Sequence, residues 1–145
     1  MKKQKDYYVV YDEVAPMPAP EKVFALEVTR IDGTDAKSFI QAWSGMQQSI
    51  HRNAVSKGWW DKKKDIPTEL LLLHAEVSEA TEALRIGNKR DEHIPSFSGL
   101  EAELADVIIR IMDLAEGTGL RIAEAVITKH VYNIQRSYRH GGKLF

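Results

Sequence analysis

Two pairs of acidic residues have a spacing that could hold a metal ion. Glu76 and Glu79 lie three residues apart in one apolar segment. Glu103 and Asp106 repeat that spacing in a later segment. On a helix, residues three apart project from neighbouring turns of one face, with their β-carbons about 5–6 Å apart. Both pairs border apolar stripes, so packing the two stripes together would bring four carboxylates into one place.

Four converging carboxylates repel one another, and a bound cation, protonation or paired basic side chains can relieve that repulsion. A divalent cation is the simplest remedy. An all-oxygen ligand set suits Mg²⁺ or Mn²⁺, ions that usually recruit phosphates, and the chain has no cysteine for softer metals. A single Glu-x-x-Glu pair is more often a solvated helix face, and Glu79 with Glu82 also matches that pattern. Two such pairs on consecutive segments favour a site.

Basic and amide side chains near the C-terminus provide the opposite charge. Lys129, Asn133 and Arg136 follow steps of four and three, so a helix would place them on one face. We interpret this face as a clamp for a polyphosphate. The basic character continues in Arg139, His140 and Lys143. For cations of this kind the alternative is that they complement the helix dipole and stay in solvent.

Two adjacent tryptophans, Trp59 and Trp60, follow Lys57 and a glycine. Adjacent side chains cannot easily share one direction, so we expect at least one ring near the surface or at an interface. An exposed ring could stack on a nucleobase, a contact worth about 1–3 kcal/mol. Packing in the core or between subunits is the more usual role for either ring. Lys57, Trp59 and Trp60 are therefore candidate contacts for a nucleotide substrate.

The elements that would position these residues can be predicted from the apolar periodicity. Helical steps of three and four run over residues 35–56, 67–86 and 98–117, and again after residue 119. Ser98 and Glu101 form a capping-box pattern at the start of the third helix. The expected core stripe of the second helix is Leu73, Val77, Ala80 and Leu84. The expected stripe of the third is Leu100, Leu104, Val107, Ile111 and Leu114.

Four amphipathic helices with short connections predict an all-α protein with a four-helix-type bundle. The stripes are broad for a chain of 145 residues, so we expect helices shared across the subunits of an oligomer. Residues 1–35 differ, because β-branched and aromatic stretches alternate with prolines there. We predict an N-terminal arm over 1–35, extended or a β-hairpin, and one helical domain over 36–145.

Composition excludes several classes of protein. Lysine plus arginine total 20 and aspartate plus glutamate total 21, a net charge of −1 that gives no general attraction for nucleic acid. No apolar run approaches the roughly twenty residues that span a bilayer, and no signal-peptide core follows the N-terminal lysines. We therefore expect a cytoplasmic protein without generic nucleic-acid or membrane partners.

From about Phe39 to Lys143 the chain resembles the MazG-like branch of the all-α nucleoside triphosphate pyrophosphatases. The resemblance is carried by Leu71–Ala80, by Glu101–Arg110, and by the segment from Lys129 through Asn133 to His140-Gly141-Gly142-Lys143. The Lys57–Trp60 stretch supports it. One departure is Ala75, since family members often carry a second acid directly before the residue that corresponds to Glu76. That departure bears on the number of metal ions.

The resemblance implies Mg²⁺-dependent hydrolysis of a nucleoside triphosphate between the α- and β-phosphates, with Mn²⁺ as a substitute, by a homodimer or homotetramer. The ions would be held by Glu76, Glu79, Glu103 and Asp106, with Glu79 the candidate to orient or deprotonate the attacking water. The β- and γ-phosphates would be contacted by Lys129, Asn133 and Arg136. The tail residues that would close over the substrate are Arg139, His140 and Lys143. Alternatives are a phosphoribosyl-ATP or dUTP-type enzyme of the same superfamily, and a non-catalytic helical interaction module.

Overall fold

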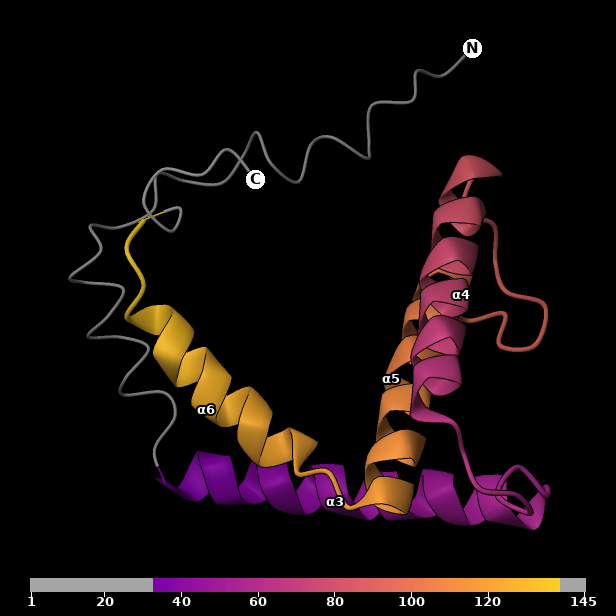
Figure 1. The fold of residues 1–145 in the computed structure, drawn as a ribbon. Coiled ribbons are helices and arrows are strands. Elements are labelled where there is room, and N and C mark those ends of the chain that lie inside the picture. Colours follow the sequence, from indigo (N-terminus) through magenta and orange to yellow (C-terminus); the bar gives the residue numbers. More distant parts are fainter. Residues whose placement is uncertain (1–32, 139–145) are drawn as a thin grey trace. The chain divides into compact units, whose positions relative to one another are not determined.

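The computed structural model describes residues 33–138. They form α3 (Gly33–Ser56), α4 (Ile66–Arg85), α5 (Gly99–Thr118) and α6 (Ile122–Ile134) (Figure 1). The all-α prediction is confirmed, because this part of the chain contains four helices and no strand. Nearly all of the predicted arm, with Arg139, His140 and Lys143, lies outside the described residues. None of the helices in the described part is long and apolar enough to cross a membrane.

The chain divides into two compact units. One, here called the central unit, is Ser38–Val126, which contains most of α3, all of α4 and α5, and the first turn of α6. The described residues of the second unit are the start of α3 and the rest of α6. The two acidic pairs belong to the central unit, and the basic residues of α6 belong to the second.

Local capping signals fix the ends of α4 and α5. At the start of α4 the Asp65 carboxylate accepts a hydrogen bond from the Thr68 N–H at 3.1 Å. The predicted capping box at α5 is confirmed, since the Glu101 carboxylate accepts the Ser98 N–H at 2.7 Å and the Ser98 hydroxyl accepts the Glu101 N–H. Helix α5 ends at Gly119, whose φ of 72° is the left-handed conformation that glycine adopts most readily.

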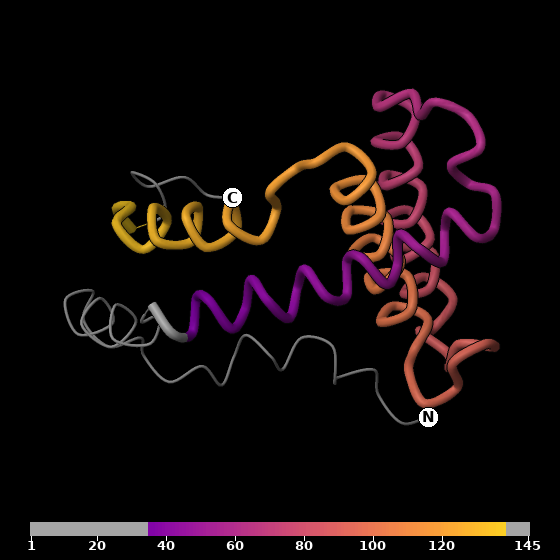
Figure 2. Tube along the Cα trace, turned by 90° about the horizontal axis from the view of Figure 1, so that it is seen from below, coloured from indigo at the N-terminus to yellow at the C-terminus, as the bar shows by residue number. Residues whose placement is uncertain are grey.

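Helices α4 and α5 form an antiparallel hairpin. Figure 1 and Figure 2 show them side by side, and their Cα traces approach closely along the pair. At the closed end the Asn88 side-chain oxygen accepts a hydrogen bond from the Leu100 N–H at 3.0 Å. Small residues line the contact, because Ala80 and Ala102 are buried and a β-carbon at Gly99 would lie 3.2 Å from that of Ala83. This close approach brings the acidic residues of the two helices together.

Burial of the apolar stripes differs from the prediction. In α4 Ala80 is buried as expected, but Val77 and Leu84 are about half exposed. In α5 Leu114 is buried, whereas Leu104 is about half exposed. No large side chain in the described part is fully buried. The expected core stripes are therefore only partly buried among the residues that the structure describes.

Candidate metal centre

Three carboxylates of the central unit meet at one point. Glu76 of α4 and Glu103 and Asp106 of α5 each offer an oxygen atom, and these three atoms lie within 4.8 Å of one another. The side chain of Glu76 is buried, that of Glu103 is half-buried and that of Asp106 is exposed. The antiparallel hairpin therefore brings three of the four predicted acidic residues together. They are called the acidic triad below.

The fourth predicted ligand, Glu79, is exposed and lies outside the triad. Its charge still acts on the triad. Burial is the main cause that raises the pKa of the Glu103 carboxyl above its ordinary value, and the charge of Glu79 is the next cause. Burial followed by the charge of Glu76 likewise raises the pKa of Asp106. Burial and neighbouring negative charge thus disfavour the ionised forms of Glu103 and Asp106.

Asp91, in the loop between α4 and α5, is a further acid that acts on the site. Its charge contributes to the raised pKa of both Glu103 and Asp106. The carboxylate accepts hydrogen bonds from the backbone N–H groups of Ile94, at 2.8 Å, and of His93, at 2.9 Å. The bond from Ile94 is the main reason that the pKa of Asp91 is lowered. No helical spacing connects Asp91 with the two acidic pairs, so the sequence pattern gave no signal for it.

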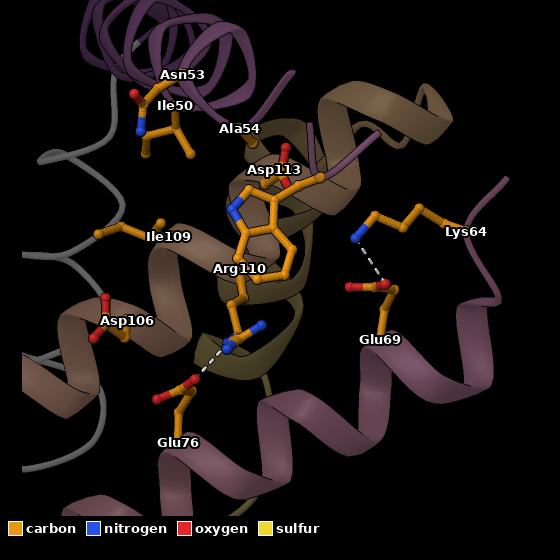
Figure 3. A pocket seen from close by; sticks show the side chains of 11 residues that line it. Ile50, Asn53, Ala54, Lys64, Glu69, Glu76, Asp106, Ile109, Arg110 and Asp113 are labelled. Carbon is orange, nitrogen blue, oxygen red and sulfur yellow. Dashed lines mark hydrogen bonds and ion pairs between the residues drawn. The ribbon is translucent and has the colours of Figure 1, made fainter. Parts of the chain in front are cut away.

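Arg110 compensates part of the negative charge. Its Nε donates to Oε1 of Glu76 at 2.5 Å, and Figure 3 shows the guanidinium directed toward that carboxylate. Arg110 follows Asp106 by four residues, so the two side chains share a face of α5. Arg110 also lies at the end of the Glu101–Arg110 stretch. Its pairing with Glu76 of the preceding helix was not predicted from the sequence.

A cavity of about 290 Å³ adjoins the triad, and its lining carries four acidic side chains, two basic ones and one indole ring. Its walls include Asn53, Trp59, Lys64, Glu76, Asp106 and Arg110. The ammonium group of Lys64 lies 2.9 Å from Oε1 of Glu69 (Figure 3). The same ammonium lies 5.9 Å and 5.4 Å from the ring centroids of the two neighbouring tryptophans. These contacts hold a positive charge at the cavity wall.

The two tryptophans have different environments. Trp59 is 68% exposed and lines the cavity. Trp60 is half-buried, and its indole N–H donates to Asp113 of α5 at 2.9 Å. His51 of α3 contacts the same carboxylate through Nδ1 at 2.7 Å. Trp60 therefore anchors the loop after α3, whereas Trp59 is the ring available to a ligand. Lys57 is exposed and is not part of the cavity wall.

The predicted phosphate clamp lies in the second unit. Lys129, Asn133 and Arg136 are all exposed, in the C-terminal half of α6 or just beyond it. The Lys129 ammonium and the Arg136 guanidinium lie over the ring of Tyr132, at 4.8 Å and 5.9 Å from its centroid. The two predicted cations therefore gather around one aromatic ring.

No protein-family model, curated protein or solved structure matches this chain. The chemistry of the donor set is therefore the basis for assigning a ligand. Three carboxylates within reach of one ion, one of them buried, fit a hard divalent cation such as Mg²⁺ or Mn²⁺. The cavity beside them adds two cationic side chains and an exposed indole.

Proposed function

We propose that this chain is a Mg²⁺-dependent nucleoside triphosphate pyrophosphohydrolase of the MazG-like type. The observation that carries the proposal is the acidic triad beside a cavity with cationic and aromatic walls. A triphosphate brings about four negative charges and would be repelled by these carboxylates without a divalent ion between them. Cleavage between the α- and β-phosphates and the identity of the ion come from the resemblance to the family.

Glu76, Glu103 and Asp106 are the residues that would hold the ion, with Glu79 beside them. When bound, Mg²⁺ neutralises phosphate charge and favours departure of pyrophosphate. Glu79 is exposed and follows Glu76 by one turn, a position that suits a group which orients or deprotonates water. The water oxygen forms a bond to the α-phosphorus as the bond to the bridging oxygen breaks. One proton passes to Glu79, and the bridging oxygen leaves on pyrophosphate.

The remaining candidate residues bind the substrate in this proposal. Trp59 offers an exposed ring for stacking on the base, and Lys64 and Arg110 are the cations at the cavity wall. The groups assigned to the β- and γ-phosphates remain Lys129, Asn133 and Arg136. The residues assigned to a closing tail remain Arg139, His140 and Lys143. Trp60 is assigned to holding the loop, since its indole is already bonded to Asp113.

A second copy of the chain is the partner that fits the exposed apolar stripes. Leu70, Val77 and Leu84 recur every seven residues on α4 and are 45–48% exposed. A repeat of seven is typical of a seam between helices. A net charge of −1 opposes self-association only weakly. We therefore assign the enzyme as a homodimer or homotetramer.

The direct test is pyrophosphate release from a panel of ribo- and deoxyribonucleoside triphosphates with Mg²⁺. We expect Glu103→Gln and Asp106→Asn to lower activity roughly a hundredfold or more. Glu82→Gln is the matched control, because Glu82 is an exposed acid of α4 that pairs with Arg85 outside the triad. Melting curves must show that each variant is folded.

Three results would redirect the proposal. Activity confined to phosphoribosyl-ATP or to dUTP would assign the chain to that branch of the superfamily. Equal activity in Glu103→Gln and wild type would refute the site. Absence of activity together with no Mg²⁺-dependent rise in melting temperature would favour a helical interaction module.

A further inference from the structure

Arg110 and a divalent ion would compete for the same carboxylate. Nε of Arg110 is 2.5 Å from Oε1 of Glu76, and Glu76 also belongs to the acidic triad. Among the side chains that the structure describes, Glu76 is the one charged group that is buried. A buried carboxylate needs a positive partner, and here two different partners are available to it.

The two members of this ion pair differ in their freedom to move. The Arg110 side chain is 40% exposed, whereas that of Glu76 is 9% exposed. The guanidinium can therefore turn into the adjoining cavity without disturbing the packing of α4 against α5, but the carboxylate cannot follow it. Figure 3 shows Arg110 among the residues that line the cavity, with Glu76 and Asp106 beside it.

On the basis of the proposed function, we propose that Arg110 is the counter-ion of Glu76 before the metal binds and a phosphate ligand of the nucleotide afterwards. The Arg110 guanidinium would be repelled by a divalent ion held at the same carboxylate and would leave Glu76 when that ion binds. The displaced fork of N–H donors matches the geometry of phosphate oxygens. Arg110 lines the same cavity as Lys64.

The competition can be measured without catalysis. Mn²⁺ is titrated calorimetrically into the full chain, without nucleotide, for wild type, Arg110→Gln and Arg110→Met. Both variants should bind Mn²⁺ roughly three- to tenfold more tightly, because no cation then occupies Glu76. Arg110→Lys should stay closer to wild type, since it keeps a cation. Arg85→Gln is the matched control, as Arg85 also pairs with a glutamate, Glu82, at 2.6 Å but on the exposed face of α4.

The second arm measures the phosphate contact. With Mn²⁺ saturating, KM for the best nucleotide should rise roughly tenfold in Arg110→Gln, with a smaller change in kcat, and should not change in Arg85→Gln. Mn²⁺ affinity equal to or weaker than wild type in both Arg110→Gln and Arg110→Met would overturn the competition. An unchanged KM would overturn the phosphate contact.

Failure of the proposed function looks different. If wild type neither binds Mn²⁺ nor releases pyrophosphate, the enzyme assignment falls, and this inference falls with it. If wild type does both while the two uncharged variants gain no affinity for the ion, only the role of Arg110 falls.

Discussion

The six-membered ring of Trp60 fills the space that a side chain at Gly117 would need. A β-carbon built on Gly117 would lie 2.0 Å from Cη2 of that ring. The ring cannot easily withdraw, because its indole N–H donates to both oxygens of Asp113, one turn earlier on α5, at 2.9 and 3.1 Å. This contact fixes the loop after α3 on α5 and so places Lys64 and Trp59 at the cavity.

Gly117→Ala should therefore destabilise the protein although alanine favours helices. We expect a loss of about 1–3 kcal/mol in the free energy of unfolding, the usual range for overpacking, measured by urea denaturation. Gly45→Ala is the control, because Gly45 lies in α3 with no atom within 4 Å of an added β-carbon. That variant should gain up to about 1 kcal/mol from helix propensity. Equal effects of the two substitutions would contradict the contact.

The raised pKa values of Glu103 and Asp106 predict that these carboxylates destabilise the metal-free protein at neutral pH. The Glu103 carboxyl has a higher pKa in the folded state than its ordinary value of 4.5. Its contribution to stability is therefore fully present below pH 4.5 and is lost as the pH rises through the folded-state pKa. Without metal, Glu103→Gln should therefore raise the melting temperature at pH 7 by a few degrees. The gain should vanish near pH 4.

Glu101 is the control on the same helix, because its pKa is lowered whereas that of Glu103 is raised. Hydrogen bonds from the Ser98 hydroxyl and then the Ser98 N–H lower the pKa of Glu101, so its stabilisation is present above the ordinary pKa of 4.5 and is lost as the pH falls through the folded pKa. Glu101→Gln should lower the melting temperature at pH 7. If both substitutions shift it in the same direction, the electrostatic account of the triad is wrong.

Divalent ions should stabilise the native chain through the triad. A ligand at one hundred times its dissociation constant adds about 2.7 kcal/mol to the free energy of unfolding when it binds only the folded state. We expect Mg²⁺ or Mn²⁺ to raise the melting temperature of wild type and to leave that of Glu76→Gln nearly unchanged. NaCl at equal ionic strength controls for general screening of charge. An equal rise in Glu76→Gln would place the ion elsewhere.

The exposed stripe of α4 should control oligomeric state. Val77→Asp places a charge in the centre of the stripe formed with Leu70 and Leu84, and should shift the protein toward monomers in sedimentation velocity. Ser78→Asp adds the same charge at an exposed neighbouring position on another face of the helix. That variant should keep the oligomeric state of wild type. A wild-type protein that is monomeric at high concentration would refute the assignment.

The features that could be predicted from the sequence are those set by local pattern. The bounds of α5 follow from the Ser98 capping box and Gly119, both of which act within one turn. The meeting of Glu76 with Glu103 and Asp106 follows because the two consecutive helices that carry the acidic pairs pack against each other.

Other features depend on contacts between distant segments. Which tryptophan faces the cavity is decided by the bond from Trp60 to Asp113, 53 residues away. Arg110 pairs with Glu76 because α5 packs against α4. The charge of Asp91 acts on Asp106 because the loop between the two helices lies near the triad. Periodicity likewise showed that Val77 belongs to an apolar face but could not show that a single chain leaves it half exposed.

Glu76 and Glu79 lie one helical turn apart but differ in solvent access, so they suit different roles. Glu76 is shielded from bulk water, so its charge must be compensated by a cation held inside the fold. Glu79 is open to bulk water, so in the proposed mechanism a proton that it takes from the attacking water could return directly to the medium. The proposed enzyme would therefore need no internal proton relay between this carboxylate and the solvent.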